Sequence, residues 1–397
     1  MRSNFEPLGK YIRKVNNRND NSEIETLKGI NIHKEFMPSV ANTIGSNMAK
    51  YRVVSQWQFA YNPMHVGRDE VLPISMSKDD TKVIVSPAYT VFEIEDHNQL
   101  NPEYLMMWCR RSEFDRNAWF TTDNSVRGGF SWESLCEMEL PVPSIEKQRE
   151  IVAEYNAVVD RIELNEQINQ NLEETAKAIY RQWFEEFEFP ISKEYAENVG
   201  KPELEGKPYK SCGGEMVYNK ELDKEIPKGW EVKTLEHFFD LSNGKTKPKT
   251  NGEVPIYGGN GILGFTNKTN FSDVIVIGRV GAKCGSLFRV KDDLWVSDNA
   301  IAADPKKNMI NFGYYLLHSL NLNKKSEGTG QPLLTQKILY PIKVLAPSEV
   351  LIKLFEDTVS NLFDFSQIME SEMKSLQSLE AVLLSRISKQ EKKVYAY

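Results

Sequence analysis

Two long stretches of the chain place apolar side chains in alternating steps of four and three, the spacing of a coiled-coil seam. The first stretch follows Pro143-Ser144 and the second follows Pro347-Ser348. The seam positions of the first are Ile151, Tyr155, Val158, Ile162, Asn165, Asn169, Leu172, Ala176, Ile179 and Trp183. The shift that places Pro143 on Pro347 also places this series, without a gap, on Phe355, Val359, Leu362, Ser366, Met369, Met373, Leu376, Glu380, Leu383 and Ile387. The shared register indicates an internal duplication; the alternative is two unrelated amphipathic helices whose stripes coincide.

The pattern predicts two long helices, over residues 143–187 and 347–391, that pack on each other. Polar residues in a seam weaken the pair but select one register and one partner. Asn165 and Asn169 stand where the second series has Met369 and Met373, so the polar positions of the two helices rarely coincide. At ~1.5 Å per residue, a helix of roughly 40 residues would extend about 60 Å. Such a pair can hold two domains at a fixed spacing.

The rest of the chain divides around these helices. Residues 1–142 and 230–346 each precede one helix and contain short β-rich runs, such as Val83–Val85 and Val274–Ile277, separated by Gly and Asn. Residues 188–229 are rich in Pro, Gly, Lys and Glu, show no sustained period and are interpreted as a connector. The predicted fold class is α+β: two mixed α/β domains separated by two long antiparallel coiled-coil helices, in a pseudo-two-fold repeat.

Charge is distributed unevenly along the chain. The formal net charge is −7, which taken alone argues against nucleic acid as a partner. Residues 230–346, however, carry 15 Lys and Arg against 10 Asp and Glu, while residues 144–199 carry 6 against 13 and residues 1–143 carry 16 against 19. Because screening limits charge effects to about 10 Å, local charge decides whether a surface can bind phosphate. The second domain is therefore the stronger DNA-binding candidate.

The sequence also suggests where the protein resides. No apolar run approaches the ~18 residues that a membrane helix needs, and residues 1–7 lack the apolar core of a secretory signal. The four cysteines, Cys109, Cys136, Cys212 and Cys284, are scattered and form no C-x-x-C pair. We therefore expect a cytoplasmic protein without disulfides, a zinc site or a membrane partner.

Several motifs suggest catalysis, but their contexts do not support it. Residues 259–264 match G-x-G-x-x-G, yet a turn-like sequence follows where a dinucleotide site needs a helix. Gly244-Lys245-Thr246 lacks the first glycine of a phosphate loop, and Asn62-Pro63-Met64-His65 lacks the second proline and the aromatic residue of a methyltransferase motif. The five histidines lie far apart. We expect a non-catalytic chain without a cofactor or metal; a stand-alone nucleic-acid methyltransferase with an unrecognised site remains an alternative.

Loops of the second domain combine glycine, lysine and amide side chains. Glycine permits close approach to a phosphate, lysine neutralises it, and Asn, Gln and Arg can read base edges. The candidate DNA-binding residues are Lys245, Lys247, Lys249, Asn260, Arg279, Lys283, Lys324, Lys325, Thr329 and Gln331. For each residue alone, a turn glycine or a solubilising surface lysine is the competing interpretation. Several such loops in one basic domain favour DNA.

The first domain offers fewer candidates. They are Lys50, Arg68, Asn124 and Arg127. Arg127 is the strongest, because it lies in a polar loop next to Gly128 and Gly129. The slightly acidic balance of residues 1–143 means that DNA binding there depends on the placement of individual charges.

The order of these segments resembles that of the specificity subunits of Type I restriction-modification systems. The most similar pieces are residues 85–89 (Val-Ser-Pro-Ala-Tyr), residues 140–148 (Leu-Pro-Val-Pro-Ser-Ile-Glu-Lys-Gln) and residues 225–230 (Glu-Ile-Pro-Lys-Gly-Trp). The entry to the second helix, Pro347-Ser348-Glu349-Val350, lacks the glutamine-containing part of that pattern. The resemblance covers essentially the whole chain and rests on the order of the pieces rather than on any one of them.

The resemblance implies that each domain reads one half of a bipartite target in double-stranded DNA and that the helices set the gap. It further implies two modification (methyltransferase) subunits and two restriction (ATP-dependent translocase/endonuclease) subunits as partners. The aromatic side chains of Tyr180, Trp183 and Phe184 exceed what a two-helix seam requires, so we predict that they bind a partner. Packing against the connector is the equal alternative for them. For the whole chain, a coiled-coil adaptor without DNA contact remains open.

Overall fold

The computed structural model describes residues 5–39, 47–64, 66–122, 129–328 and 332–387. Contacts divide the chain into two compact units, one formed by residues 1–165 and 371–397 and the other by residues 166–370. Each unit contains a domain with its own strands and short helices, together with part of both long helices, α5 (Ile145–Tyr180) and α9 (Glu349–Arg386). The predicted fold class is confirmed.

The two long helices pack antiparallel within each unit. In the first unit Tyr155 of α5 donates to Glu380 of α9 at 2.7 Å, and Arg161 of α5 pairs with Glu372 of α9. Residues later in α5 thus contact residues earlier in α9. In the second unit the ring of Tyr180 lies 5.9 Å from that of Phe355. All the predicted seam side chains of both helices are buried or half-buried, whereas most residues between them are exposed. The seam was therefore correctly identified from its spacing.

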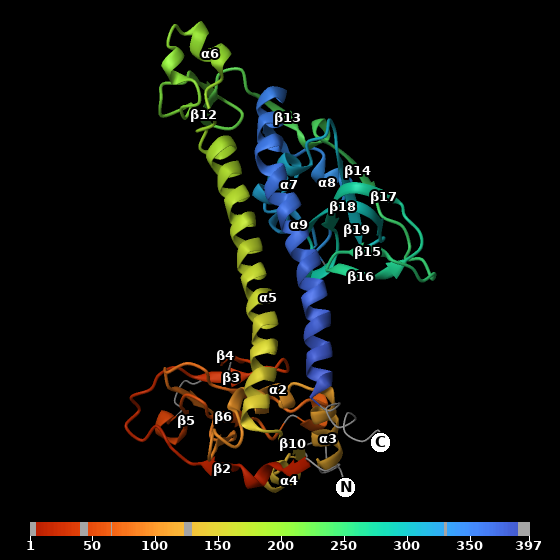
Figure 1. Cartoon of the computed structure of the whole chain (residues 1–397). Coiled ribbons are helices and arrows are strands. Elements are labelled where there is room, and N and C mark those ends of the chain that lie inside the picture. Colours follow the sequence, from red (N-terminus) through yellow and green to blue (C-terminus); the bar gives the residue numbers. More distant parts are fainter. Residues whose placement is uncertain (1–4, 40–46, 65, 123–128, 329–331, 388–397) are drawn as a thin grey trace, which may run out of the picture. The chain divides into compact units, whose positions relative to one another are not determined.

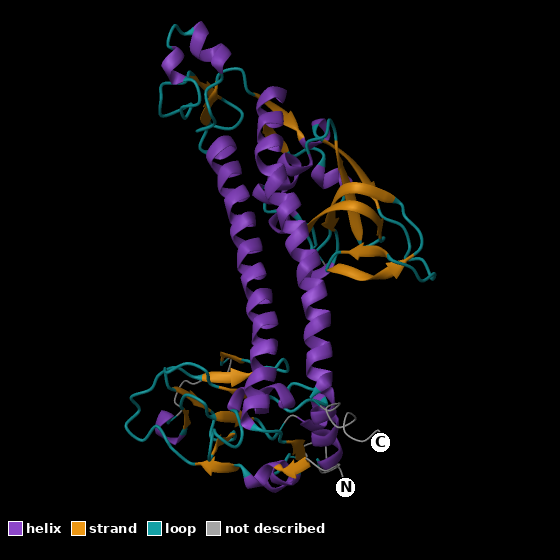
Figure 2. Cartoon of the chain, viewed as in Figure 1, coloured by secondary structure: helices purple, strands orange, loops and turns teal. Residues whose placement is uncertain are grey.

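The domain of the first unit is built on a four-stranded antiparallel sheet in the order β2-β9-β6-β7. These strands are β2 (Ile12–Val15), β6 (Phe59–Tyr61), β7 (Ile74–Met76) and β9 (Thr90–Ile94). Two-stranded sheets are formed by β3 (Lys28–Ile30) with β4 (Phe36–Pro38) and by β5 (Arg52–Val54) with β8 (Val83–Val85). The helices are α1 (Val66–Asp69), α2 (Pro102–Cys109), α3 (Ser112–Thr121) and α4 (Trp132–Glu137). Figure 2 shows this mixture of helices and strands.

The domain of the second unit has a larger sheet of six strands in the order β14-β19-β17-β18-β15-β16. These strands are β14 (Phe239–Asn243), β15 (Val254–Gly258), β16 (Gly261–Thr266), β17 (Phe271–Gly278), β18 (Leu287–Val296) and β19 (Ala300–Pro305). All neighbours are antiparallel except β15 and β18. The helices are α7 (Ile310–Ser319) and α8 (Gln336–Leu339). The predicted run Val274–Ile277 lies in the central strand β17 and is fully buried.

The two domains are closed in the same way. In the first, β1 (Phe5–Pro7) pairs antiparallel with β10 (Glu139–Pro141), and α5 begins shortly after β10. In the second, β13 (Glu231–Thr234) pairs antiparallel with β20 (Lys343–Ala346), and α9 begins shortly after β20. First and last strands thus meet where the chain enters each long helix. This shared closure supports the internal duplication.

The segment between α5 and the second domain is folded. It contains α6 (Lys193–Asn198) and a hairpin of β11 (Met216–Asn219) and β12 (Lys224–Pro227). Ile191, Ala196 and Tyr209 form its buried centre, and the rings of Phe189 and Tyr209 stack at 4.5 Å. The connector therefore has a small core built on aromatic residues, although its sequence shows no sustained period.

No helix among the described residues is both long and apolar enough to cross a membrane.

Candidate nucleic-acid interface

The candidate interface lies in the second domain, where loops distant in sequence meet at one end of the six-stranded sheet. Strand β17 ends at Gly278, whose backbone N–H donates to the carbonyl of Ser286 at 2.9 Å; the N–H of Gly285 returns a bond to Gly278 at 2.8 Å. Arg279 donates to the Asn299 carbonyl at 3.1 Å, which joins this loop to the one between β18 and β19. These backbone bonds fix where the neighbouring side chains emerge.

The hairpin turn that carries Asn260 belongs to the same group of loops. The hydroxyl of Ser286 donates to the carbonyl of Gly259 at 2.6 Å, next to Asn260. The side chain of Asn260 is exposed. Asn260, Arg279 and Lys283, which the sequence separates, are therefore held in neighbouring loops.

Lys324 and Lys325 are brought to this group by a close backbone contact. They end a 3-10 turn that begins at Leu322. Gly285 has a φ of 89°, and a Cβ there would lie only 2.5 Å from the backbone nitrogen of Asn323. Glycine is thus needed at position 285 for the two loops to touch. Lys283, Lys324 and Lys325 are all exposed.

The lysine-rich segment after β14 begins at the same end of the sheet and then follows its edge. The N–H of Lys245 donates to the carbonyl of Val296 at 3.0 Å. Farther along, the ammonium group of Lys247 donates to the carbonyl of Leu263 at 2.9 Å, so part of its hydrogen-bonding capacity is used within the chain. Lys245, Lys247 and Lys249 are exposed. The structure therefore places Lys245 with the loop group, and Lys247 along strand β16.

Arg279 differs from the lysines because it is half-buried. Its Nε is buried and has no hydrogen-bond partner among the described residues. Leaving such a donor without a partner costs free energy unless water or a ligand satisfies it. Two carboxylates, Asp298 and Glu327, lie in the same loops and are exposed. Arg279, Lys245, Lys283, Lys324 and Lys325 outnumber them, so the loop group is basic.

The remaining predicted residues are not part of this group. Lys50 belongs to the other domain, where it is exposed at the end of the 3-10 turn Met48–Lys50. The backbone of Arg68 lies in α1, and its side chain is outside what the structure describes. The predicted residues Asn124, Arg127, Thr329 and Gln331 lie outside the described residues.

Comparison with known proteins finds similarity to one family. Residues 227–380 match the model of the Type I restriction modification DNA specificity domain. The HindI specificity subunit of Haemophilus influenzae is 23% identical over 96% of this chain and 97% of that protein. Both matches are to Type I restriction-modification specificity subunits, the family that the order of the segments predicted.

Two further matches extend this comparison. The MjaIX specificity subunit of Methanocaldococcus jannaschii is 36% identical over 29% of this chain, a match that spans only 22% of that protein. The crystal structure of the Type I restriction-modification S subunit of M. genitalium matches with a TM-score of 0.60 at 15% identity, covering 96% of this chain and 95% of that one. At this sequence identity, the match shows that the two chains share a fold.

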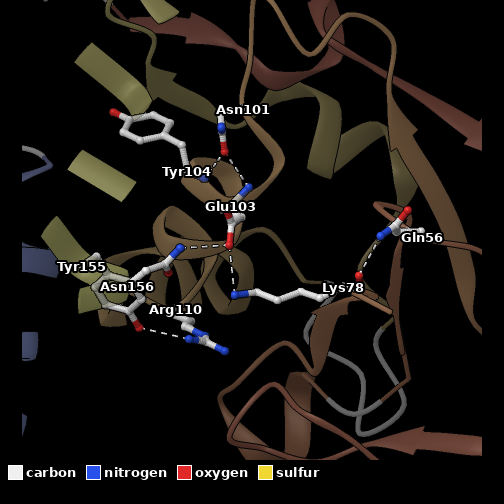
Figure 3. A network of polar contacts seen from close by, with 8 residues as sticks. All are labelled: Gln56, Lys78, Asn101, Glu103, Tyr104, Arg110, Tyr155 and Asn156. Carbon is white, nitrogen blue, oxygen red and sulfur yellow. Dashed lines mark hydrogen bonds and ion pairs between the residues drawn. The ribbon is translucent and has the colours of Figure 1, made fainter. Parts of the chain in front are cut away.

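Polar contacts tie helix α5 to the domain of the first unit. Figure 3 shows Glu103 of α2 accepting from Asn156 of α5 at 3.1 Å and pairing with Lys78 at 3.0 Å. Nearby, Arg110 donates to the hydroxyl of Tyr155 at 3.0 Å. Because these bonds link α5 to the body of the domain at several points, the domain and this part of the helix are held together.

Gln148 makes a further link that the sequence did not explain. Its side chain is fully buried, accepts from the N–H of Asn101 at 2.8 Å, and donates to the carbonyls of Gln99 at 3.0 Å and Pro143 at 2.8 Å. Gln148 belongs to residues 140–148, one of the segments on which the family resemblance rests. At the second helix entry the matching position is Ile352, which is buried in an apolar core. The missing glutamine there is thus replaced by apolar packing.

The predicted partner-binding aromatics lie in the core of the second unit. Tyr180, Trp183 and Phe184 are 6%, 9% and 6% exposed. The ring of Phe184 lies 4.9 Å from Phe312 and 5.2 Å from Phe355. Internal packing therefore accounts for their aromatic character, and their binding to a partner stays a prediction. The alternative interpretation named only the connector as the packing partner of these three side chains. Most of their neighbours belong instead to α7 and α9.

Proposed function

We propose that this specificity subunit reads a bipartite sequence in double-stranded DNA, one half with each domain, while α5 and α9 set the gap between the halves. It would act in the cytoplasm as the non-catalytic member of a complex with two modification (methyltransferase) and two restriction (ATP-dependent translocase/endonuclease) subunits.

The observation that carries this proposal is the group of basic loops at one end of the β14–β19 sheet. Lys245, Lys283, Lys324 and Lys325 come from three separate loops and are exposed, and backbone contacts join these loops to the one that carries the half-buried Arg279. Lysines can neutralise phosphates, while an arginine can donate two hydrogen bonds to a guanine edge. The backbone bonds between these loops hold the loop backbones in place before DNA arrives, which lowers the entropic cost of binding.

The duplicated plan supports a two-part target. Each domain is closed by its first and last strands immediately before a long helix. Because the two domains share a plan, each is expected to read its own DNA segment. A pair of packed helices is stiff enough to keep the spacing of the domains constant. The acidic first helix need not approach phosphate, and its exposed carboxylates suit contact with protein partners.

The first experiment is to map methylated adenines in the host genome, with and without the intact gene for this chain. The expected result is one bipartite motif with an indifferent spacer of fixed length, lost when the chain is absent. Replacing residues 1–142 by those of a relative should change only one half of the motif. A change in both halves, or an undivided motif, would contradict the proposal.

Individual side chains can be tested with the assembled complex. Arg279→Ala should lower affinity by about 1–3 kcal/mol for duplexes that carry the correct base pair and relax preference at that position. Lys245→Ala should weaken binding to all duplexes alike and reduce the salt dependence of binding. DNA binding that is weak and insensitive to salt in the assembled wild-type complex would favour the adaptor without DNA contact.

A further inference from the structure

The hairpin formed by β15 and β16 exposes an unusual group of apolar side chains. Ile262, Leu263 and Phe265 are 51%, 41% and 54% exposed, although they lie within five residues of each other on one strand. Strand β16 is the outermost strand of the six-stranded sheet, as Figure 1 shows. A strand with one solvent-facing side would alternate buried and exposed residues. This strand does not.

A β-bulge explains the broken alternation. Ile256 of β15 pairs with Gly264, while the next residue, Tyr257, pairs with Ile262, so Leu263 has no partner opposite it. An extra residue on one strand reverses the faces of the residues beyond it. Ile262 and Phe265, three positions apart, would otherwise point to opposite faces and are instead on the same one. Bulges at sheet edges commonly redirect side chains in this way.

The backbone edge of β16 is protected, whereas its apolar side chains are not. Lys247 donates to the outward carbonyl of Leu263, and the hydroxyls of Thr250 and Thr266 lie 2.8 Å apart. Gly264 has a φ of 144°, and a Cβ there would lie 3.2 Å from the Lys247 ammonium group. A covered edge opposes the addition of a strand from another protein. Whatever binds here must therefore use the side chains.

The charges around the hairpin indicate what binds. Lys245, Lys249 and Lys268 are exposed in the segments that precede and follow it, and Glu253 is the only acidic residue in the sequence between positions 245 and 268. Glu370 of α9 lies near Tyr257 of β15 and is the acidic neighbour from another element. A basic surface with an apolar centre complements a duplex, which offers phosphates at its rim and thymine methyl groups in its major groove. A two-stranded ribbon also fits the width of the major groove, about 12 Å.

We infer that the β15–β16 hairpin enters a groove of the target duplex, where Ile262 and Phe265 make apolar contacts with base edges, chiefly thymine methyl groups. Lys249 and Lys268 hold the flanking phosphates. The inference rests on the proposed function and makes it more specific. Two apolar side chains, neither of which was a predicted site residue, determine part of the DNA sequence that the second domain reads.

The test uses the assembled complex and duplexes that carry the target found by methylation mapping. Affinity is measured for that target and for duplexes with single base-pair changes in either half, over a range of salt concentrations. The double variant Ile262→Ala/Phe265→Ala should lose about tenfold discrimination at one half-site, the size of one lost base-pair contact. Its salt dependence should match that of the wild type. Phe265→Ala alone should show part of this change.

Two other variants separate the contributions. Lys249→Ala should weaken binding to all duplexes and lower the slope of log affinity against log salt by about 0.9, the value for one phosphate contact. Val217→Ala, which changes an exposed apolar residue of strand β11, is the matched control and should alter neither quantity. Unaltered thermal unfolding would show that the variants fold.

Two results would overturn the inference while leaving the proposed function intact. One is a double variant that discriminates at both half-sites like the wild type. The other is a double variant that reads DNA normally but no longer assembles with the modification subunits, which would make the hairpin a protein interface. If the wild-type complex itself discriminates at neither half-site, the proposed function fails first.

Discussion

Lys34 is a buried cation in the first domain, 4% exposed, and its partners hold it in place. Its ammonium group donates to both oxygens of Asp115 at 2.8 Å and to the carbonyl of Cys109. Asp115 also accepts from the N–H of Leu72 at 3.1 Å. Burial lowers the pKa of Lys34, and the neighbouring carboxylate of Asp115 opposes that shift. The pair joins a loop to helices α2 and α3.

Removing one member of this pair should therefore be costly. We expect Lys34→Met to destabilise the protein by about 3 kcal/mol, because Asp115 is then left with a buried charge. Urea unfolding followed by tryptophan fluorescence measures the effect. Lys10→Met, which removes an exposed ion pair with Glu6, is the control and should cause no measurable change. Equal stability of the two variants would show that Asp115 takes up a proton without cost.

Glu356 is a half-buried carboxylate near the start of α9 in the second unit. Its carboxylate accepts from the N–H of Phe312 at 2.7 Å. Burial raises its pKa, and the hydrogen bonds from Phe312 and Asn311 oppose that shift. A raised pKa for an acid means that the folded state binds a proton more tightly than the unfolded one. This stability is present at low pH and is lost as the pH rises through the folded pKa.

Glu356→Gln should remove that pH dependence while keeping an acceptor for Phe312. We expect the variant to be at least as stable as the wild type at neutral pH, and the difference to shrink under mildly acidic conditions. Thermal unfolding over this pH range is the measurement. Glu349→Gln is the opposite control: its ion pair with Lys307 lowers the pKa of Glu349, so that contribution is lost as pH falls. The same pH trend in both variants would contradict the assignment.

At the scale of elements, the helix pair of the first unit contains a polar layer. Asn165 is fully buried, and its amide donates to Glu372 at 3.0 Å while its Oδ1 has no partner among the described residues. Arg161 donates to both oxygens of Glu372, at 3.1 and 3.0 Å. An apolar seam would be more stable, but a polar layer favours one register because any shift separates its members.

Asn165→Leu should therefore stabilise the helix pair by about 1 kcal/mol, since it removes a buried oxygen that lacks a partner. Chemical unfolding followed by far-ultraviolet circular dichroism measures the change. Leu164→Ala, at an exposed neighbouring position, controls for effects of helix propensity. A loss of stability on replacing Asn165 would mean that its bond to Glu372 outweighs the unpaired oxygen.

At the scale of the whole molecule, the proposed function makes helix length a determinant of the target. Inserting seven residues after Asn165 and seven after Glu370 keeps the seam in register and lengthens each helix by about 10.5 Å. At 3.4 Å per base pair, the spacer of the methylated motif should grow by about three base pairs. Sequencing that detects methylated adenine gives the spacer length directly.

The control for this experiment is an insertion of the same seven residues after Gly213 in the connector. Gly213 is exposed in a turn of the connector, so an insertion there leaves the seam register of both long helices unchanged. The connector variant should keep the original spacer. An unchanged spacer in the lengthened helices would show that they do not set the gap.

Helices α5 and α9, their shared seam and the α+β class could be predicted from the sequence. The reason is that each turn of an amphipathic helix needs an apolar residue on its buried face, as from Tyr155 to Trp183. This pattern can be read from residues that are close together in the sequence. Short apolar runs such as Val83–Val85 and Val274–Ile277 likewise identified strands, because a buried strand needs consecutive apolar residues.

What the tertiary structure alone decided depends on contacts between residues far apart in the chain. Local pattern could not show that Gly285 touches Asn323, or that this contact brings Lys283 and Lys324 together. It could not separate a surface role for Trp183 from burial, because an aromatic residue on a helix suits both. The unpaired Leu263 depends on the register between two strands, which their sequences do not specify. The side chains offered to a partner are thus set by non-local backbone bonds.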